Sequence, residues 1–257
     1  MRVIPLKSRV VKRGDDLVGL LLDSIEAAGE SLDDGDIVAV ADKVIAHVKG
    51  RIVDYSSIKP SEEAVKLARE AELEPGFAEL VLEHSDLVIG TAYRTILTIK
   101  DGVLVANAGI DHKNAPGGHA ALWPEDPNRE AEEIRLEILR RTSRRVGVIV
   151  VDSRLAPLRR GTTGFALGIS GFKGVRDFRG GRDLFGNRIY VTMMNVADEL
   201  ASAAHLYMGE AAELTPFVLI KDPPVELGDF DPELLKISPE ECAYFKPLYS
   251  KLASKLR

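Results

Sequence analysis

VIVVDSRLAPLRRGTTGFALG, residues 148–168, begins as a buried strand and then changes character. The opening VIVV consists of β-branched residues, which favour a strand. An acid and a hydroxyl, Asp152 and Ser153, follow directly, and a loop with Arg159 and Arg160 leads into a glycine-spaced apolar segment. The stretch therefore predicts a core strand that delivers a carboxylate close to two guanidinium groups.

The segments before this stretch show strand and helix patterns in turn. DIVAVADKVIAHVKGRIV, residues 36–53, opens with a strand at Ile37–Val40 after the turn DDGD. Residues 60–84 predict two helices, because Ser61 is a favourable N-cap for the first and Pro75 suits the first turn of the second.

Hairpins and helices also follow one another through the rest of the chain. Residues 90–111 predict a hairpin that turns at Lys100–Asp101–Gly102 and ends on an acid. Asn128 is expected to cap a helix that leads into the opening strand. The remaining predicted elements are a turn-rich loop that runs into a strand at 177–196, a small-residue helix at 196–211 and a strand in PFVLIKD. Since strands and helices do not alternate steadily, the pattern predicts an α+β fold.

Composition restricts the classes of protein to which the chain can belong. Its 257 residues carry a net charge of −6, which disfavours nucleic acid or an anionic membrane as the main partner. The single cysteine, Cys242, can form neither an internal disulfide nor a cysteine-based metal cluster. The first residues lack the apolar core of a signal peptide, and the longest apolar runs are only strand-length. We expect a cytoplasmic protein with no nucleic-acid or membrane partner.

Three acids follow apolar segments along the chain. They are Asp111 after VLVANAGI, Asp152 after VIVV and Glu210 after the small-residue helix, and Ser153 adds a hydroxyl. Carboxylates at the ends of rigid elements are suitable ligands for Mg²⁺ or Mn²⁺, which also bind substrate phosphates. The alternative is that each acid simply marks the point where its strand or helix reaches the surface.

The stretch PLRRGTTGFALGISGFKGVRDFRGGRDLFGNR is both basic and rich in glycine. Glycines allow close approach of the backbone to an anion, and arginines bind phosphate or carboxylate through two nitrogens. The alternative is a solvated loop whose arginines pair with surface acids. Walker A spacing, a strand-following GxGxxG, a zinc motif and a GxSxG nucleophile are all absent from the sequence.

Four segments in a fixed order carry a family resemblance: NAGID (107–111), VVDS (150–153), residues 159–192 and NVADELASAAHLYMGEA (195–211). Through them the chain resembles the archaeal coenzyme F420-0:L-glutamate ligases, GTP-dependent enzymes that add glutamate to a deazaflavin. The resemblance covers about residues 1–222, which are expected to form one ligase-like domain. Residues 223–257 match nothing in the family and are expected to be a C-terminal tail of unknown role.

The resemblance implies an intertwined homodimer of α+β fold, with mixed and antiparallel sheets and packed helices. It implies two divalent cations per subunit, Mg²⁺ or Mn²⁺, with GTP as co-substrate. Asp111 and Asp152 correspond to ligands of one metal, and Ser153 and Glu210 to ligands of the other. The positions that correspond to nucleotide contacts are Ser8, Arg9, Val10, Val11, Asp42, Lys43, His47, Asn114, Met208, Gly209 and Ala211.

The implied reaction is amide formation through an acyl phosphate. A carboxylate of F420-0 attacks the γ-phosphate of GTP, and the amine of L-glutamate then displaces the phosphate. Charge develops on oxygen in both steps, so metals and the arginines Arg159 and Arg160 are expected to neutralise it. On this interpretation Asp152 holds metal, and the two arginines hold anionic substrate.

The chain departs from the family pattern around the pocket. Asp42, Lys43 and His47 stand where a small polar pair and a lysine are usual, Leu155 and Ala156 where glycine and arginine are usual, and Ala212 and Glu213 where an acid and a glycine are usual. Besides the F420-0 ligase, two alternatives therefore stay open. One is a ligase with a changed nucleotide or acceptor, and the other is a binding protein that has lost catalysis.

Overall fold

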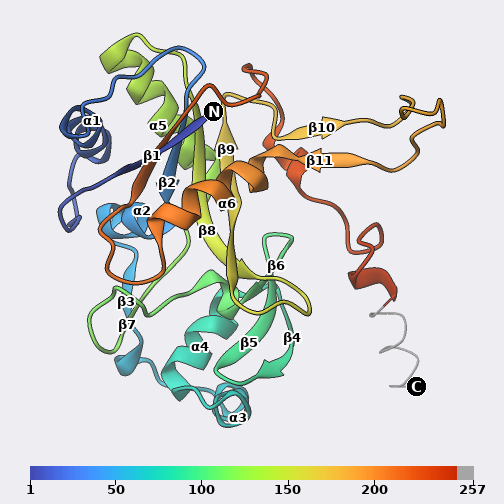
Figure 1. Cartoon of the computed structure of the whole chain (residues 1–257). Coiled ribbons are helices and arrows are strands. Elements are labelled where there is room, and N and C mark those ends of the chain that lie inside the picture. The colour runs from blue at the N-terminus through green and yellow to red at the C-terminus, as the bar shows by residue number, and fades with distance from the viewer. Residues whose placement is uncertain (248–257) are drawn as a thin grey trace.

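The computed structural model describes residues 1–247. The chain forms two lobes, a larger one around a five-stranded sheet and a smaller one around a three-stranded sheet (Figure 1). The α+β prediction is confirmed, because the sheets are mixed or antiparallel and helices pack against them.

The five-stranded sheet has the order β1 (Arg2–Leu6), β12 (Phe217–Lys221), β2 (Ile37–Ala41), β8 (Gly147–Leu155) and β9 (Thr162–Ser170). Only β2 and β8 pair in parallel, with Ala41 opposite Val151. The residues that follow this pair, Asp42 and Asp152, therefore arrive at the same edge of the sheet. The strand predicted at Ile37–Val40 is confirmed as β2.

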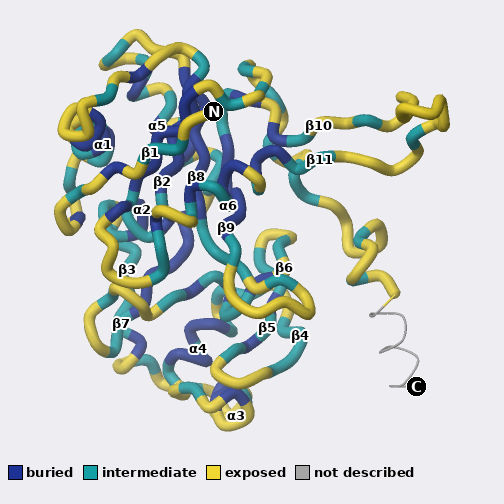
Figure 2. The backbone as a smooth tube through the Cα atoms, viewed as in Figure 1, coloured by how far each residue is buried: buried dark blue, intermediate teal, exposed yellow. Residues whose placement is uncertain are grey.

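Alternation along the strands produces two cores, one on each face of this sheet. Val38 and Val40 face α1 (Leu17–Ala27) and α5 (Pro127–Thr142). Ile37 and Ala39 face α6 (Val196–Met208) on the opposite side. The central strands are buried on both faces (Figure 2), which is why VIVV and IVAV are almost wholly apolar.

The smaller lobe is an antiparallel meander covered by two helices. Its strands are β4 (Leu87–Ala92), β5 (Thr95–Lys100) and β6 (Val103–Ala106), and its helices are α3 (Glu62–Ala71) and α4 (Pro75–His84). Ser61 caps α3 and Pro75 begins α4, as predicted. The pair β3 (Ile52–Asp54) and β7 (His119–Ala121) connects this lobe to the larger one (Figure 1).

The hairpin predicted to turn at Lys100–Asp101–Gly102 is confirmed as β5 and β6, which pair in antiparallel fashion. The prediction missed the further strand β4, because Arg94 takes a left-handed conformation and turns the chain between β4 and β5. Two other local predictions were wrong. Asp126, rather than Asn128, caps α5, since its carboxylate accepts from the N–H of Arg129 and Pro127 occupies the first turn. The strand β8 also does not end before Asp152, because its pairing with β9 continues to the bottom of a long hairpin.

The loop predicted at 177–196 belongs to an arm that projects from the larger lobe. Its base is the pair β10 (Val175–Asp177) and β11 (Met193–Asn195), and its outer part is exposed (Figure 2). Beyond residue 222 the chain includes the short helix η3 (Pro232–Leu235), and Leu227 and Leu235 pack against the α6 side of the core. In residues 1–247 no helix is long and apolar enough to span a membrane.

Candidate active site

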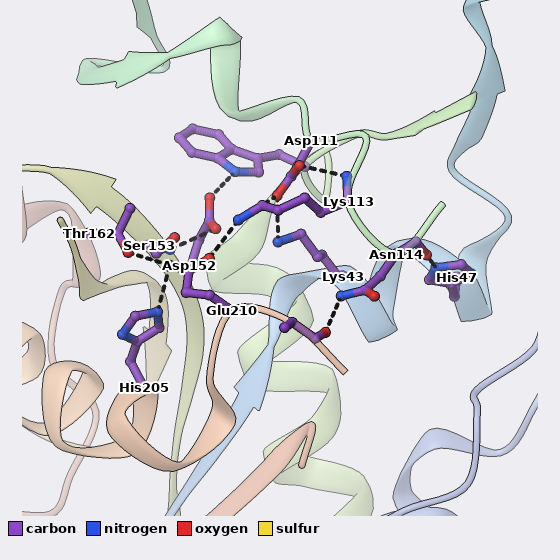
Figure 3. Close-up of polar contacts among 12 residues, drawn as sticks. Lys43, His47, Asp111, Lys113, Asn114, Asp152, Ser153, Thr162, His205 and Glu210 are labelled. Atoms are coloured by element: carbon purple, nitrogen blue, oxygen red, sulfur yellow. Dashed lines mark hydrogen bonds and ion pairs between the residues drawn. The ribbon is translucent and has the colours of Figure 1, made fainter. Parts of the chain in front are cut away.

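Four carboxylates converge between the two lobes (Figure 3 shows three of them). Asp42 begins α2 (Asp42–Lys49), Asp152 comes from β8, Asp111 follows η2 (Asn107–Gly109), and Glu210 follows α6. Burial raises the pKa of Asp42 well above its ordinary value, and the charge of Asp152 raises it further. Burial also raises the pKa of Asp152. Burial thus favours the protonated forms of Asp42 and Asp152, whereas Asp111 and Glu210 stay partly exposed to water.

Two lysines neutralise part of the negative charge of these acids. Lys43 Nζ lies 2.7 Å from an oxygen of Asp111, and Lys113 Nζ lies 2.6 Å from Glu210 and 3.7 Å from Asp111. Burial tends to raise the pKa of Asp111, but Lys43 outweighs it and keeps that pKa below its ordinary value. For Glu210, hydrogen bonds from Lys113 and Thr162 overcome burial and lower the pKa to about 2.

Asp152 is oriented by two donors. Trp123 Nε1 donates to one carboxylate oxygen at 2.6 Å, and the N–H of Ser153 donates to the other at 2.7 Å. The indole is 2% exposed and packs directly over Gly109, where a Cβ would lie 2.0 Å from the ring. Glycine at this position is therefore what allows the indole to reach Asp152.

A turn with left-handed backbone conformation precedes Asp111 and places it in the cluster. Asn107, Ala108 and Gly109 all have positive φ, a conformation that costs roughly 1–2 kcal/mol for a residue with a side chain. The turn is held in place by buried Thr98, whose hydroxyl accepts from the N–H of Ala108 at 2.9 Å. Local strain of this kind occurs at functional sites, where the surrounding fold maintains it.

Glu210 is fixed from two elements. Thr162 Oγ1 on β9 donates to its Oε1 at 2.5 Å, and His205 Nε2 on α6 lies 3.0 Å from the same oxygen. Figure 3 shows both side chains directed at Glu210. The carboxylate consequently has little freedom to leave the cluster.

The predicted nucleotide contacts surround one cavity of about 500 Å³ beside the four acids. His47 donates to the carbonyl of Asn114 at 3.2 Å, and the amide of Asn114 donates to the carbonyl of Ala211 at 2.8 Å, so three separate segments are joined at its rim. The predicted contacts that line it are Arg9, Val10, Val11, Asp42, Lys43, His47, Asn114, Met208, Gly209 and Ala211.

Ser8 lies just outside this lining. Its N–H donates to the carbonyl of Leu214, and its hydroxyl is buried with no hydrogen-bond partner among residues 1–247. Such an unpaired hydroxyl next to a cavity is available to a bound polar ligand.

The structure does not bring Arg159 and Arg160 to the acids. Both are exposed in the turn between β8 and β9 and line neither of the two cavities next to Asp152. The hairpin extends past Asp152, which separates the arginines from it along the strand. Their catalytic role stays a prediction.

Sequence reasoning missed several residues that complete the cluster. Trp123, Lys113, Thr162 and His205 each contact an acid directly. A signal was present for His205, which stands five residues before Glu210 at the end of the same helix. No pattern linked Trp123 to Asp152, because their contact joins segments 29 residues apart.

The sequence is similar to a known family and to several named proteins. A sequence model of the family F420-0:gamma-glutamyl ligase matches residues 5–222. The chain belongs to this family. A coenzyme F420:L-glutamate ligase of Methanopyrus kandleri is 37% identical over 229 residues, 89% of this chain and 88% of that protein. Proteins of the same name from Methanothermobacter thermautotrophicus and Archaeoglobus fulgidus are 37% and 38% identical, over 84% and 82% of this chain and 86% and 83% of theirs.

The donors of this ligase-family site suit a hard divalent cation. Carboxylate and hydroxyl oxygens are the ligands that Mg²⁺ and Mn²⁺ prefer, and two of these carboxyl groups have pKa values raised by burial. As the side chains stand in residues 1–247, no three acids or histidines meet closely enough to hold a metal ion. Instead the ammonium groups of Lys43 and Lys113 lie against the acids. The carboxylate and hydroxyl oxygens suit a divalent cation. When no cation is bound, the two lysines supply the positive charge that balances the acids.

Proposed function

We propose that this protein is a GTP- and divalent-metal-dependent ligase that joins L-glutamate to coenzyme F420-0. The observation that carries the proposal is the cluster of four carboxylates, three of which (Asp42, Asp152 and Glu210) line a 500 Å³ cavity, in a chain of the F420-0:gamma-glutamyl ligase family. Such a cavity is within the usual size range for a small-molecule ligand.

Asp111, Asp152, Ser153 and Glu210 would hold Mg²⁺ or Mn²⁺. A bound divalent cation supplies positive charge for the phosphate oxygens of the nucleotide. The residues around the larger cavity hold GTP, and Lys43 lies at its inner wall, where it attracts phosphate. Lys113 faces the acids from the other side and is placed to bind a departing anion.

The proposed reaction is the amide formation that the family resemblance implies. A carboxylate of the acceptor attacks the γ-phosphorus of GTP, and GDP leaves. The amine of L-glutamate then attacks the acyl carbon, the C–N bond forms, and inorganic phosphate leaves with the electrons of the C–O bond. Fixed cationic groups lower the barrier because they are already in place when the negative charge develops.

A specific observation favours a second candidate, a ligase with a changed nucleotide. Asp42 places a carboxyl group at the wall of the nucleotide cavity, where a charged form repels phosphate. His47 lines the same wall.

The proposed function is tested by supplying purified protein with Mn²⁺, L-glutamate, F420-0 and either GTP or ATP. We expect glutamylated F420 by mass spectrometry and one phosphate released per glutamate, with GTP and only with metal. Saturation with GTP at a hundred times its Kd should stabilise the fold by about 2.7 kcal/mol, measured by thermal unfolding. Product with ATP in place of GTP would favour the second candidate, and no product with either would contradict both.

We also propose that two copies associate through the arm between β10 and β11. Leu184, Phe185 and Val191 on this arm are 100%, 90% and 84% exposed, an unusual grouping of large apolar side chains in one exposed segment. Burying such side chains against a second copy is favourable at about 25 cal/mol per Å².

The double variant Leu184→Asp/Phe185→Asp is therefore expected to convert a dimer into a monomer, measured by light scattering during size-exclusion chromatography. Tyr93→Asp, at an exposed turn of the smaller lobe, is the matched control and should leave the dimer intact. A dimer that survives the arm substitutions would show that the arm is not the contact.

A further inference from the structure

A second, smaller cavity adjoins the acids from the other side. Its volume is about 250 Å³, half that of the nucleotide cavity, and the two share only Asp152 and Ser153 in their linings. One wall is the end of the β8–β9 hairpin, and the other is β6 with the turn that leads to Asp111. It is therefore a cleft between the two lobes, a common position for a ligand site.

We propose that this smaller cavity binds the L-glutamate co-substrate. The inference rests on the proposed ligase function and adds to it the place of the amino acid. A volume of 250 Å³ is below the range usual for nucleotide-sized or drug-sized ligands and suits a single amino acid.

The charges of this cavity suit a dicarboxylate. Arg154 and Lys113 are the cationic side chains that line it, from opposite walls. Arg154 is held in a defined position, because its Nη2 donates to Asp198 at 2.7 Å and its guanidinium lies 5.0 Å from the ring centre of Phe165. It remains 39% exposed, so further N–H groups are available to a carboxylate.

The spacing along β8 suits the length of glutamate. Arg154 lies two residues beyond Asp152, about 7 Å at a rise of ~3.3 Å per residue. A carboxylate on Arg154 therefore leaves the α-amine close to the wall that both cavities share. That wall is where an acyl phosphate formed from the nucleotide would lie.

The amide-forming step balances in this arrangement. The α-ammonium of glutamate loses one proton to solvent and attacks the acyl carbon as the free amine. The C–N bond forms, the C–O bond to phosphate breaks, and phosphate leaves with the electron pair and the second proton. No oxidant or further co-reactant is needed.

Two variants test the placement. Arg154→Gln removes the guanidinium, and Leu155→Glu introduces a repelling carboxylate at a position that is 54% exposed and therefore tolerates the change. Arg154→Gln is expected to raise the KM for L-glutamate by about 10- to 100-fold, the usual effect of losing a charge-assisted hydrogen bond. Leu155→Glu is expected to raise the same KM through repulsion between carboxylates. The Kd for GTP, measured by calorimetry, should not change. Arg129→Gln, on the exposed face of α5, is the control and should alter neither constant.

Equilibrium dialysis with radiolabelled L-glutamate, Mn²⁺ and a non-hydrolysable GTP analogue separates this inference from the ligase function. Glutamate retained by the unmodified protein and lost by both variants supports the placement, even without turnover. Unchanged glutamate binding in both variants overturns it while leaving the ligase function standing. A raised KM for F420-0 with an unchanged KM for glutamate overturns it too, by assigning the cavity to the acceptor.

Discussion

Replacing Asp152 by asparagine is expected to lower the rate of glutamate ligation by about 10³-fold or more and to leave the fold intact. Among residues 1–247, Asp152 is the one acid that lines both cavities. It also lies close to Lys43, so its charge acts on the ligands of both cavities. Loss of one preorganised electrostatic group at a reacting centre usually costs 10²- to 10³-fold, and loss of a metal ligand adds to this. The measurement is kcat with saturating GTP, glutamate and F420-0.

The fold should survive because the native carboxylate is costly to bury. Since burial raises the pKa of Asp152, its ionised form opposes folding at neutral pH, and a neutral amide removes that penalty. Asn still offers an oxygen to the Trp123 or Ser153 donor. The control is Asp229→Asn, which also removes one acidic group but at a side chain that is 97% exposed.

Normal turnover in Asp152→Asn would contradict the proposed mechanism. If the unmodified protein binds its ligands and shows no turnover, the binding-protein alternative is favoured.

Gly109→Ala is expected to reduce the free energy of unfolding by about 2–5 kcal/mol. The added methyl would lie 2.0 Å from the Trp123 ring, and overpacking of this kind usually costs ~1–3 kcal/mol. The left-handed conformation of Gly109, φ +72°, adds about 1–2 kcal/mol for any residue with a Cβ. Urea unfolding measures the change, and displacement of the indole from Asp152 should lower activity in the protein that still folds.

Gly29→Ala separates the two contributions. Gly29 has φ +71°, and no atom of residues 1–247 lies within 4 Å of an added Cβ, so its substitution carries the conformational cost alone. We expect it to cost about 1–2 kcal/mol and to leave activity unchanged. Equal losses of stability in the two variants would show that the indole moves aside freely, and that Trp123 does not hold Asp152 firmly.

Local patterns predicted the elements whose formation is decided by neighbouring residues. The strand of IVAV, the Ser61 cap and the helix ending at Met208 follow from hydrophobic runs, capping and small-residue spacing. The hairpin that turns at Lys100–Asp101–Gly102 was also predicted correctly. The added strand β4 was not, because its turn depends on a left-handed conformation of Arg94, and a non-glycine residue rarely adopts that conformation. Pairing of β1 with β12 joins residues more than 200 positions apart, and no local pattern specifies that.

The sequence predicted the acids of the site. It did not predict the side chains that donate hydrogen bonds to those acids. Asp111, Asp152 and Glu210 end apolar segments, and such segments meet at one place in the fold. The donors to these acids come from other helices and strands. Local sequence patterns therefore could not predict the contacts of Trp123 and Thr162. Asp42 was predicted beside the nucleotide, and the structure adds that the charge of Asp152 raises its pKa, which makes it a fourth member of the carboxylate cluster.

The position of β12 between β1 and β2 has a consequence for the newly made chain. Residues 9–11 line the nucleotide cavity only when β1 is held in the sheet, and among residues 1–247 the strand that pairs with β1 is β12, whose first residue is Phe217. During synthesis, β1 therefore stays unpaired until the ribosome has made β12, which follows more than 200 residues later. Incomplete translation products consequently lack the nucleotide cavity, however much of the remaining fold they have formed.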